Sequence, residues 1–95
     1  MVVGVLTVDL YFPESRSIKE KRQYLRSIKE RIKNSFNVSV AEVDGQDLWQ
    51  RSLLAVVCVG AERSIAEEIL AKVRNFVDKS YPEFILSTRV EFINL

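Results

Sequence analysis

Two segments of this chain, Val2–Phe12 and Leu53–Gly60, are almost continuously apolar and rich in β-branched residues. Apolar side chains occupy both odd and even positions of each segment, which is typical of strands in the middle of a sheet. Each segment is followed by a stretch with the apolar spacing of an amphipathic helix. The chain is therefore predicted to fold as a β-sheet with helices packed against it.

The first helix is predicted to begin at Ser17, because Ser17 and Glu20 have the spacing of a capping box. In a capping box the serine hydroxyl accepts a hydrogen bond from the third amide, and the glutamate reaches back to the first. The apolar stripe of this helix consists of Ile18, Leu25, Ile28, Ile32 and Phe36.

The second helix is predicted to begin near Ser64, where Ser64 and Glu67 repeat the capping-box spacing. Pro82 ends this helix at or before Tyr81, since the residue before a proline disfavours helical geometry. Its apolar stripe consists of Ile65, Ile69, Val73 and Phe76.

Two further strands complete the fold. They are predicted over Val38–Val43, which Asp44 and Gly45 close with a turn, and over Phe84–Leu95. The order β-α-β-β-α-β with two right-handed crossovers gives a four-stranded antiparallel sheet with both helices on one face. The two most apolar strands are expected at its centre, and 95 residues are expected to form a single domain, 1–95.

The sheet face opposite the helices is also predicted to be apolar, because neither central strand alternates cleanly with polar residues. An exposed apolar patch of more than a few hundred Å² usually marks a contact with a partner. We expect a second copy of the chain to cover it, so that the protein is a homodimer through its sheet face or an edge strand. The alternative is a monomer with a somewhat apolar surface.

Positive charge is concentrated between Arg16 and Lys33, where eight bases and two acids give a net charge of +6. The rest of the chain has six bases and eleven acids, so a near-neutral whole contains a strong local field. Five of the bases lie within an arc of about 80° on the first helix and flank its apolar stripe. We call these five residues the basic row: Lys19, Arg22, Arg26, Lys29 and Lys33. The row could follow a phosphate backbone, or it could be an ordinary solvated helix face that pairs locally with Glu30.

Lys21 is an exception, because it projects onto the apolar side of the first helix near Leu25 and Ile28. We expect its amine to extend past the edge of the core into solvent. The alternative is an ion pair with Asp9 or Glu42.

A dense group of polar residues surrounds the turn after the second strand. Glu42 and Asp44 are expected to share a strand face, where Asp47 could join them in a weak metal site. We favour a structural hairpin, in which Trp49 fills the edge of the core and the acids cap turns and pair with Arg51. The same group could also contact a partner: Glu42, Asp44, Asp47, Trp49 and Arg51.

Several function classes are disfavoured. There is no histidine and no glycine-rich phosphate loop, so we expect neither an enzyme nor a cofactor or bound metal. The single cysteine, Cys58, has apolar neighbours and is interpreted as a buried structural thiol. No apolar run approaches the roughly 20 residues of a membrane span, and the N-terminus lacks a basic leader, so a cytoplasmic protein without membrane contact is expected.

Three blocks of sequence are similar to the YlxP-like family of small bacterial proteins. The blocks are Ser15–Arg22, Phe36–Asp44 and Gln46–Arg51, and the resemblance extends from Val2 to the end of the second helix. It implies a ferredoxin-like α/β sandwich of unknown function, in agreement with the predicted order of elements. Members are often encoded beside translation initiation factor 2 and ribosome-binding factor A, which implies a link to the ribosome or RNA but supplies no functional residues.

These observations favour an RNA- or ribosome-associated accessory protein that contacts phosphates through the basic row. The strand Arg51–Val59 contains no aromatic residue on which a base could stack, so RNA is expected at the helix and not on the sheet. The alternative is a homo-oligomeric protein-interaction module that does not bind nucleic acid.

Overall fold

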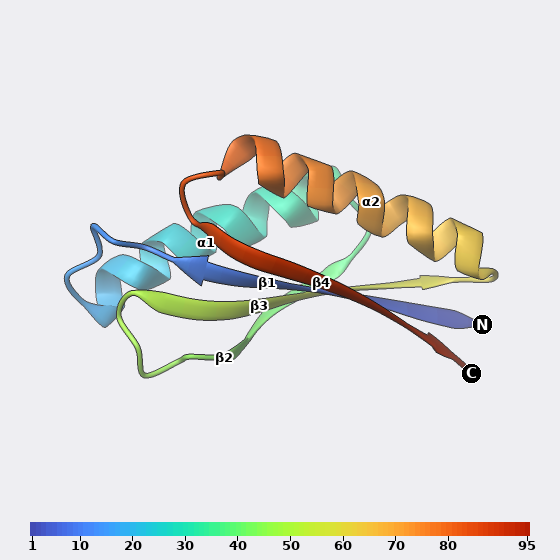
Figure 1. Ribbon diagram of the computed structural model, residues 1–95, viewed down its shortest axis with the longest axis horizontal. Coiled ribbons are helices and arrows are strands. Elements are labelled where there is room, and N and C mark those ends of the chain that lie inside the picture. The colour runs from blue at the N-terminus through green and yellow to red at the C-terminus, as the bar shows by residue number, and fades with distance from the viewer.

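The computed structural model describes residues Met1–Leu95, and its elements follow the order β-α-β-β-α-β (Figure 1). The elements are β1 (Val2–Tyr11), α1 (Ile18–Ser35), β2 (Ser39–Asp44), β3 (Arg51–Gly60), α2 (Arg63–Ser80) and β4 (Ile85–Asn94). The predicted number and order of elements are confirmed.

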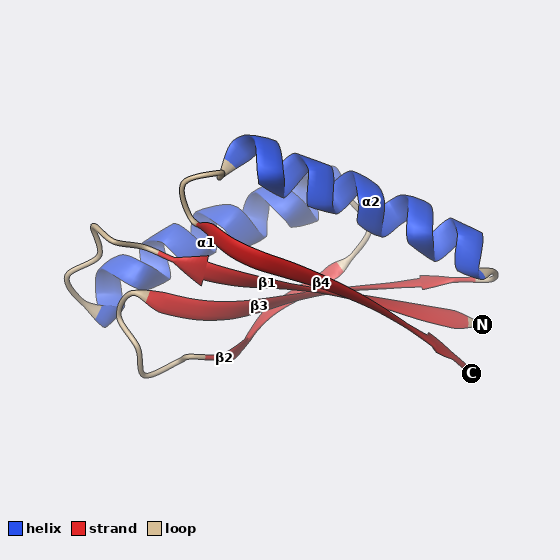
Figure 2. Cartoon of the chain, viewed as in Figure 1, coloured by secondary structure: helices blue, strands red, loops and turns tan.

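The four strands form one antiparallel sheet with the spatial order β2-β3-β1-β4. The two apolar strands β1 and β3 are therefore central, as predicted. Both helices lie on the same side of the sheet, and the other side is uncovered (Figure 2). This arrangement is a ferredoxin-like α+β fold.

The core fills the space between the helices and the sheet. The even-numbered residues of β1 and β3 face the helices, and Leu6, Val8 and Leu54 are fully buried there. The helices contribute Leu25, Ile28, Ile32, Leu70, Val73 and Val77. No helix is both long enough and apolar enough to cross a bilayer.

The two helices begin differently. The Ser17 hydroxyl accepts a hydrogen bond from the Glu20 amide at 3.1 Å, as predicted. The Glu20 carboxylate accepts from the amide of Arg16 at 2.7 Å, one residue before the expected partner. The second predicted capping box does not form, because α2 already begins at Arg63 and Ser64 lies inside its first turn.

Candidate functional site

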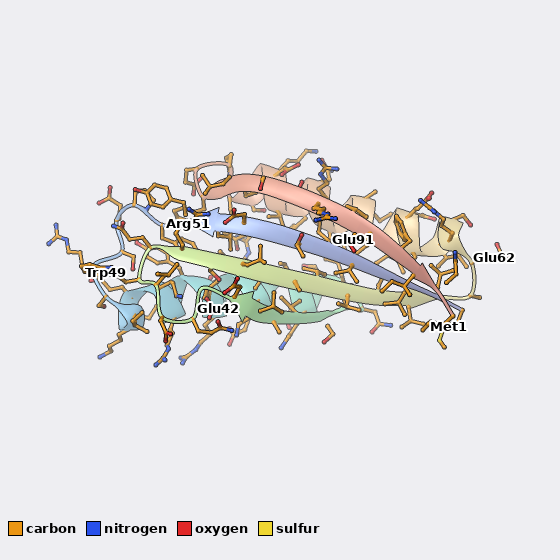
Figure 3. The ribbon with its side chains drawn as sticks, turned by 60° about the horizontal axis from the view of Figure 1, so that its bottom comes forward. Met1, Glu42, Trp49, Arg51, Glu62 and Glu91 are labelled. Carbon is orange, nitrogen blue, oxygen red and sulfur yellow. The ribbon has the colours of Figure 1, made fainter.

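The basic row lies on the flank of α1 that borders the edge strand β2. In Figure 3, side chains of α1 that end in nitrogen project past this edge of the sheet. Lys29 is half-buried and the other four cations are exposed. No member of the row lies within 4.0 Å of a carboxylate, and Glu30 pairs with neither Arg26 nor Lys33. The protein's own acids therefore do not neutralise the row through ion pairs.

Lys21 is fully buried and bonded to the hairpin between β2 and β3, so the prediction that its amine reaches solvent was wrong, and the alternative of an ion pair with Glu42 is confirmed. Its Nζ donates to Glu42 Oε2 at 3.0 Å and to the backbone oxygens of Gly45 at 2.7 Å and Arg51 at 3.2 Å. These acceptors satisfy all three N–H groups of the ammonium. The same Glu42 oxygen accepts from the Ser52 hydroxyl at 2.7 Å. The contacts fasten the start of α1 to the hairpin.

A β-bulge separates Glu42 from Asp44, because Glu42 lies opposite Leu54 whereas Asp44 lies opposite Leu53. Glu42 consequently faces the helices and Asp44 faces the uncovered side, so the expectation of a shared face was wrong. Asp47 lies exposed in the turn, and no three His, Cys, Asp or Glu side chains are grouped to hold a metal ion. Asp44 does cap the turn, accepting from the Gly45 amide at 2.7 Å.

The contacts of Arg51 and the position of Trp49 also differ from the predictions. Arg51 pairs with Asp9 of β1 through both carboxylate oxygens, at 2.9 and 3.0 Å, and not with the hairpin acids. Trp49 is 55% exposed and lies at an extremity of the molecule, so it does not fill the core edge (Figure 3). Its neighbour Leu48 and the nearby Val43 are exposed as well. The hairpin therefore presents apolar side chains to solvent.

The uncovered sheet face has an apolar end and a charged end. Val3 lies between Val59 and Ile93, and Val5 lies opposite Val57, so these five side chains form one apolar patch. Val59 is 61% and Ile93 is 47% exposed. The Arg89–Glu91 ion pair borders this patch, because Glu91 lies opposite Val5, and the Asp9–Arg51 ion pair lies toward the other end of the face.

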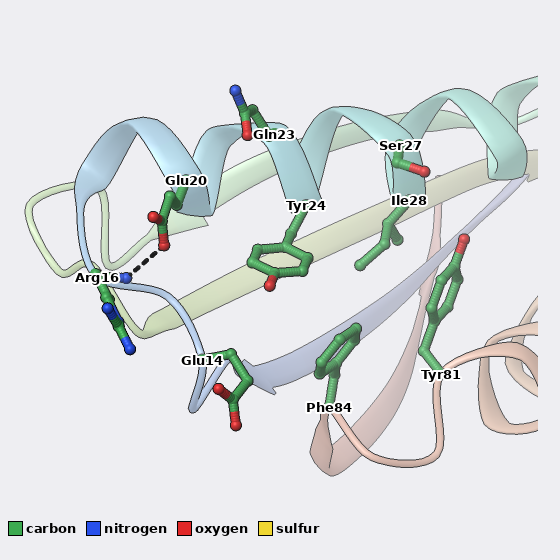
Figure 4. Close-up of a pocket in the computed structure, with 9 residues that line it drawn as sticks. All are labelled: Glu14, Arg16, Glu20, Gln23, Tyr24, Ser27, Ile28, Tyr81 and Phe84. Carbon is green, nitrogen blue, oxygen red and sulfur yellow. Dashed lines mark hydrogen bonds between the residues drawn. The ribbon is translucent and has the colours of Figure 1, made fainter.

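The structure also contains a groove that the sequence did not predict. It encloses about 630 Å³ between α1, the β1–α1 loop and the α2–β4 connection (Figure 4). Its walls include three aromatic rings and three charged side chains: Tyr24, Tyr81, Phe84, Glu14, Arg16 and Glu20. The one signal in the sequence was Tyr24, a large ring on α1 outside the predicted apolar stripe.

Cys58 is buried under α2, as predicted, and its thiol donates to the Ala66 carbonyl at 3.8 Å. Desolvation raises the pKa of this thiol, and a hydrogen bond with the Gly4 backbone offsets part of the rise. The thiolate is therefore disfavoured near neutral pH, which suits a packing role and not a nucleophile.

The fold and its surfaces define a small ferredoxin-like protein with an unpaired basic flank and no grouped metal ligands. Residues 3–90 match the family described as "Protein of unknown function (DUF503)", and the chain belongs to this family. It is 37% identical over 82 residues to the uncharacterized protein YlxP of Bacillus subtilis (strain 168), a match covering 86% of this chain and 88% of that protein. The predicted family resemblance is confirmed.

A likeness among solved structures supports the fold alone. The de novo designed protein Foldit4 superposes with a TM-score of 0.57 at 12% identity, covering 99% of this chain and 97% of that one. A designed protein with so little shared sequence carries no information about what this surface binds.

Proposed function

We propose that this protein is a cytoplasmic, non-enzymatic accessory factor that binds RNA through the basic row. The bound RNA is either free or part of the ribosome. The observation that carries the proposal is that these five cations lie along one flank of α1 without any ion pair to the protein's own carboxylates. Lys19 and Lys33 are about 21 Å apart along the helix axis. That length suffices for contact with several successive phosphates.

The chemistry of the sheet supports the helix as the contact surface. Sheet-based RNA-binding domains stack bases on aromatic side chains of their central strands. On the uncovered face, the β3 side chains Leu53, Ala55, Val57 and Val59 have no rings, and β1 contributes a single ring, Tyr11 at its end. The basic row, in contrast, presents positive charges to the phosphates. Phosphate contacts dominate the affinity of most nucleic-acid complexes.

Binding of single-stranded RNA is expected to depend steeply on salt. Four phosphate contacts predict a slope of about −3 for log affinity against log salt concentration. The double variant Arg22→Glu with Arg26→Glu removes two contacts, so the slope should fall to about −1.5 and the affinity at low salt by at least about tenfold. Fluorescence anisotropy of a labelled RNA at several salt concentrations measures both quantities.

The matched control reverses two charges elsewhere. Arg74→Glu with Lys79→Glu makes the same change in net charge at two exposed positions of α2 that have no ion pair. If the control loses as much affinity as the α1 variant, the basic row is not the binding surface. Absence of RNA binding at low salt contradicts the proposal altogether.

A second candidate is self-association without nucleic-acid binding, which the apolar patch on the uncovered face supports. Val59→Lys places a charge at the most exposed member of the patch and is expected to convert a dimer of 11.0 kDa chains into monomers. Sedimentation velocity distinguishes the two species. Ile65→Lys, at an exposed apolar position of α2, is the control and should remain dimeric.

Two sedimentation results determine which surfaces pair in this dimer and whether the dimer exists. A dimer that persists in Val59→Lys indicates pairing through an edge strand, β2 or β4, in place of the sheet face. A wild-type protein that is monomeric at about 100 µM rules out a functional homodimer of ordinary affinity.

A further inference from the structure

The groove between α1 and the α2–β4 connection differs in chemistry from the basic row. Glu20, Tyr24 and Ser27 of α1 face the groove, and the centre of the basic row lies about 145° away around the helix axis. Figure 4 shows Glu14 and Glu20 toward one end and the rings of Tyr24, Tyr81 and Phe84 beyond them. A volume of about 630 Å³ is within the range of known ligand sites.

The aromatic walls are held rigidly by their neighbours. Tyr24 stacks on the buried ring of Phe12, with centroids 5.1 Å apart and planes 8° from parallel. Phe84 meets Tyr24 edge-on at 5.6 Å and lies nearly parallel to Tyr81 at 6.4 Å. Tyr24 and Phe84 remain half-buried, so parts of both rings are open to the groove. A ligand would therefore meet preorganised ring surfaces.

The charged groups give the groove an acidic end. Neither Glu14 nor Glu20 forms an ion pair, and the hydrogen bond from the Arg16 amide to Glu20 uses one of the two carboxylate oxygens. Arg16 lines the same end without pairing with either carboxylate, so these three side chains sum to one negative charge. Free carboxylates beside aromatic faces favour a cation and disfavour a phosphate.

A guanidinium of this chain already lies against one of these rings. The Arg31 Cζ is 5.2 Å from the centroids of both Phe76 and Tyr81, and its NH1 donates to the Tyr81 hydroxyl at 2.8 Å. Planar guanidinium groups stack on rings and bond carboxylates through two parallel N–H groups, which a lysine ammonium cannot do. The ring cluster thus suits a second guanidinium on its groove side.

We propose that this groove binds an arginine side chain of a partner protein. The guanidinium packs against the open parts of the Tyr24 and Phe84 rings, stacking on one ring and meeting the edge of the other, and donates to the carboxylates of Glu14 and Glu20. This site goes beyond the proposed RNA contact, since it lies on the other flank of α1 and recognises a cation in a polypeptide.

The test is an NMR titration with a capped Gly-Arg-Gly tripeptide and its citrulline counterpart, which keeps the shape of arginine but has no charge. Amide signals of residues lining the groove should shift with the arginine peptide, and the citrulline peptide should bind at least about tenfold more weakly. No shift at about 20 mM arginine peptide, or equal binding of citrulline, overturns the proposal. Shifts produced by guanosine monophosphate but not by the arginine peptide would instead assign the groove to nucleic acid.

Variants confirm the location. Glu14→Gln with Glu20→Gln should weaken arginine binding by about tenfold or more, while the side-chain amide oxygen introduced by Glu20→Gln can still accept from the Arg16 amide. The control Glu30→Gln with Glu62→Gln changes the net charge equally at exposed positions outside the groove and should bind as the wild type does. The Arg22→Glu, Arg26→Glu variant should also retain groove binding, which separates this proposal from the RNA proposal. Equal loss in the Glu30 and Glu62 control would refute a specific site.

Discussion

Glu42→Ala is expected to lower the free energy of unfolding by about 3 to 5 kcal/mol, because it leaves the ammonium of Lys21 buried without its counter-charge. The two backbone carbonyls that also accept from Lys21 provide dipoles but no negative charge. Ser52 loses the acceptor of its hydroxyl in the same variant. Urea denaturation, followed by circular dichroism, measures the change.

Removing both charges is expected to recover much of this loss. Lys21→Met fills the same space with apolar atoms, and in the Lys21→Met, Glu42→Gln variant no buried charge remains unpaired. The double variant should therefore be clearly more stable than Glu42→Ala. If Glu42→Ala unfolds at the wild-type urea concentration, the ion pair does not fasten α1 to the hairpin.

Phe12→Ala is expected to cost about 3 to 5 kcal/mol, the usual range for truncating a buried aromatic side chain. Phe12 is fully buried, stacks on Tyr24 and meets Phe84 edge-on at 5.0 Å. Its loss leaves a cavity directly beneath the rings of the groove. The same denaturation experiment measures the loss of stability.

The adjacent Tyr11→Ala serves as the control, because Tyr11 is on the other side of β1 and is exposed. We expect it to cost much less than Phe12→Ala. Comparable losses in the two variants would mean that the effect comes from the strand itself and not from the aromatic cluster.

The fold could be predicted because its signals are local. Continuous apolar runs identified β1 and β3 as the central strands, and the stripe containing Leu25, Ile28 and Ile32 located the buried side of α1. The cap at Ser17 was also predictable, since both partners lie within one turn. The apparent cap at Ser64 failed because the same spacing occurs inside a first turn.

Glu42 could be named from the sequence only as an alternative partner of Lys21, because the acceptors of Lys21 lie 21 to 30 residues away along the chain. A bulge between Glu42 and Asp44 places the two acids on opposite faces of the sheet, and nothing in the six-residue strand signals the extra residue. The groove was missed for a related reason. Two segments that are distant in sequence form it, residues 14–28 and 81–84, and each segment alone resembles an ordinary loop or helix face.

The one-sided placement of the basic row has a consequence for how this molecule approaches a polyanion. Because the molecule is nearly neutral overall, a distant polyanion attracts it only weakly. The cations along one border still experience a torque in the field of the polyanion. The field of a polyanion rotates the molecule until α1 and the β2 edge lead, so that encounters begin in a single orientation. The groove and the apolar end of the uncovered sheet face then point away from the polyanion, where they remain accessible to a third molecule.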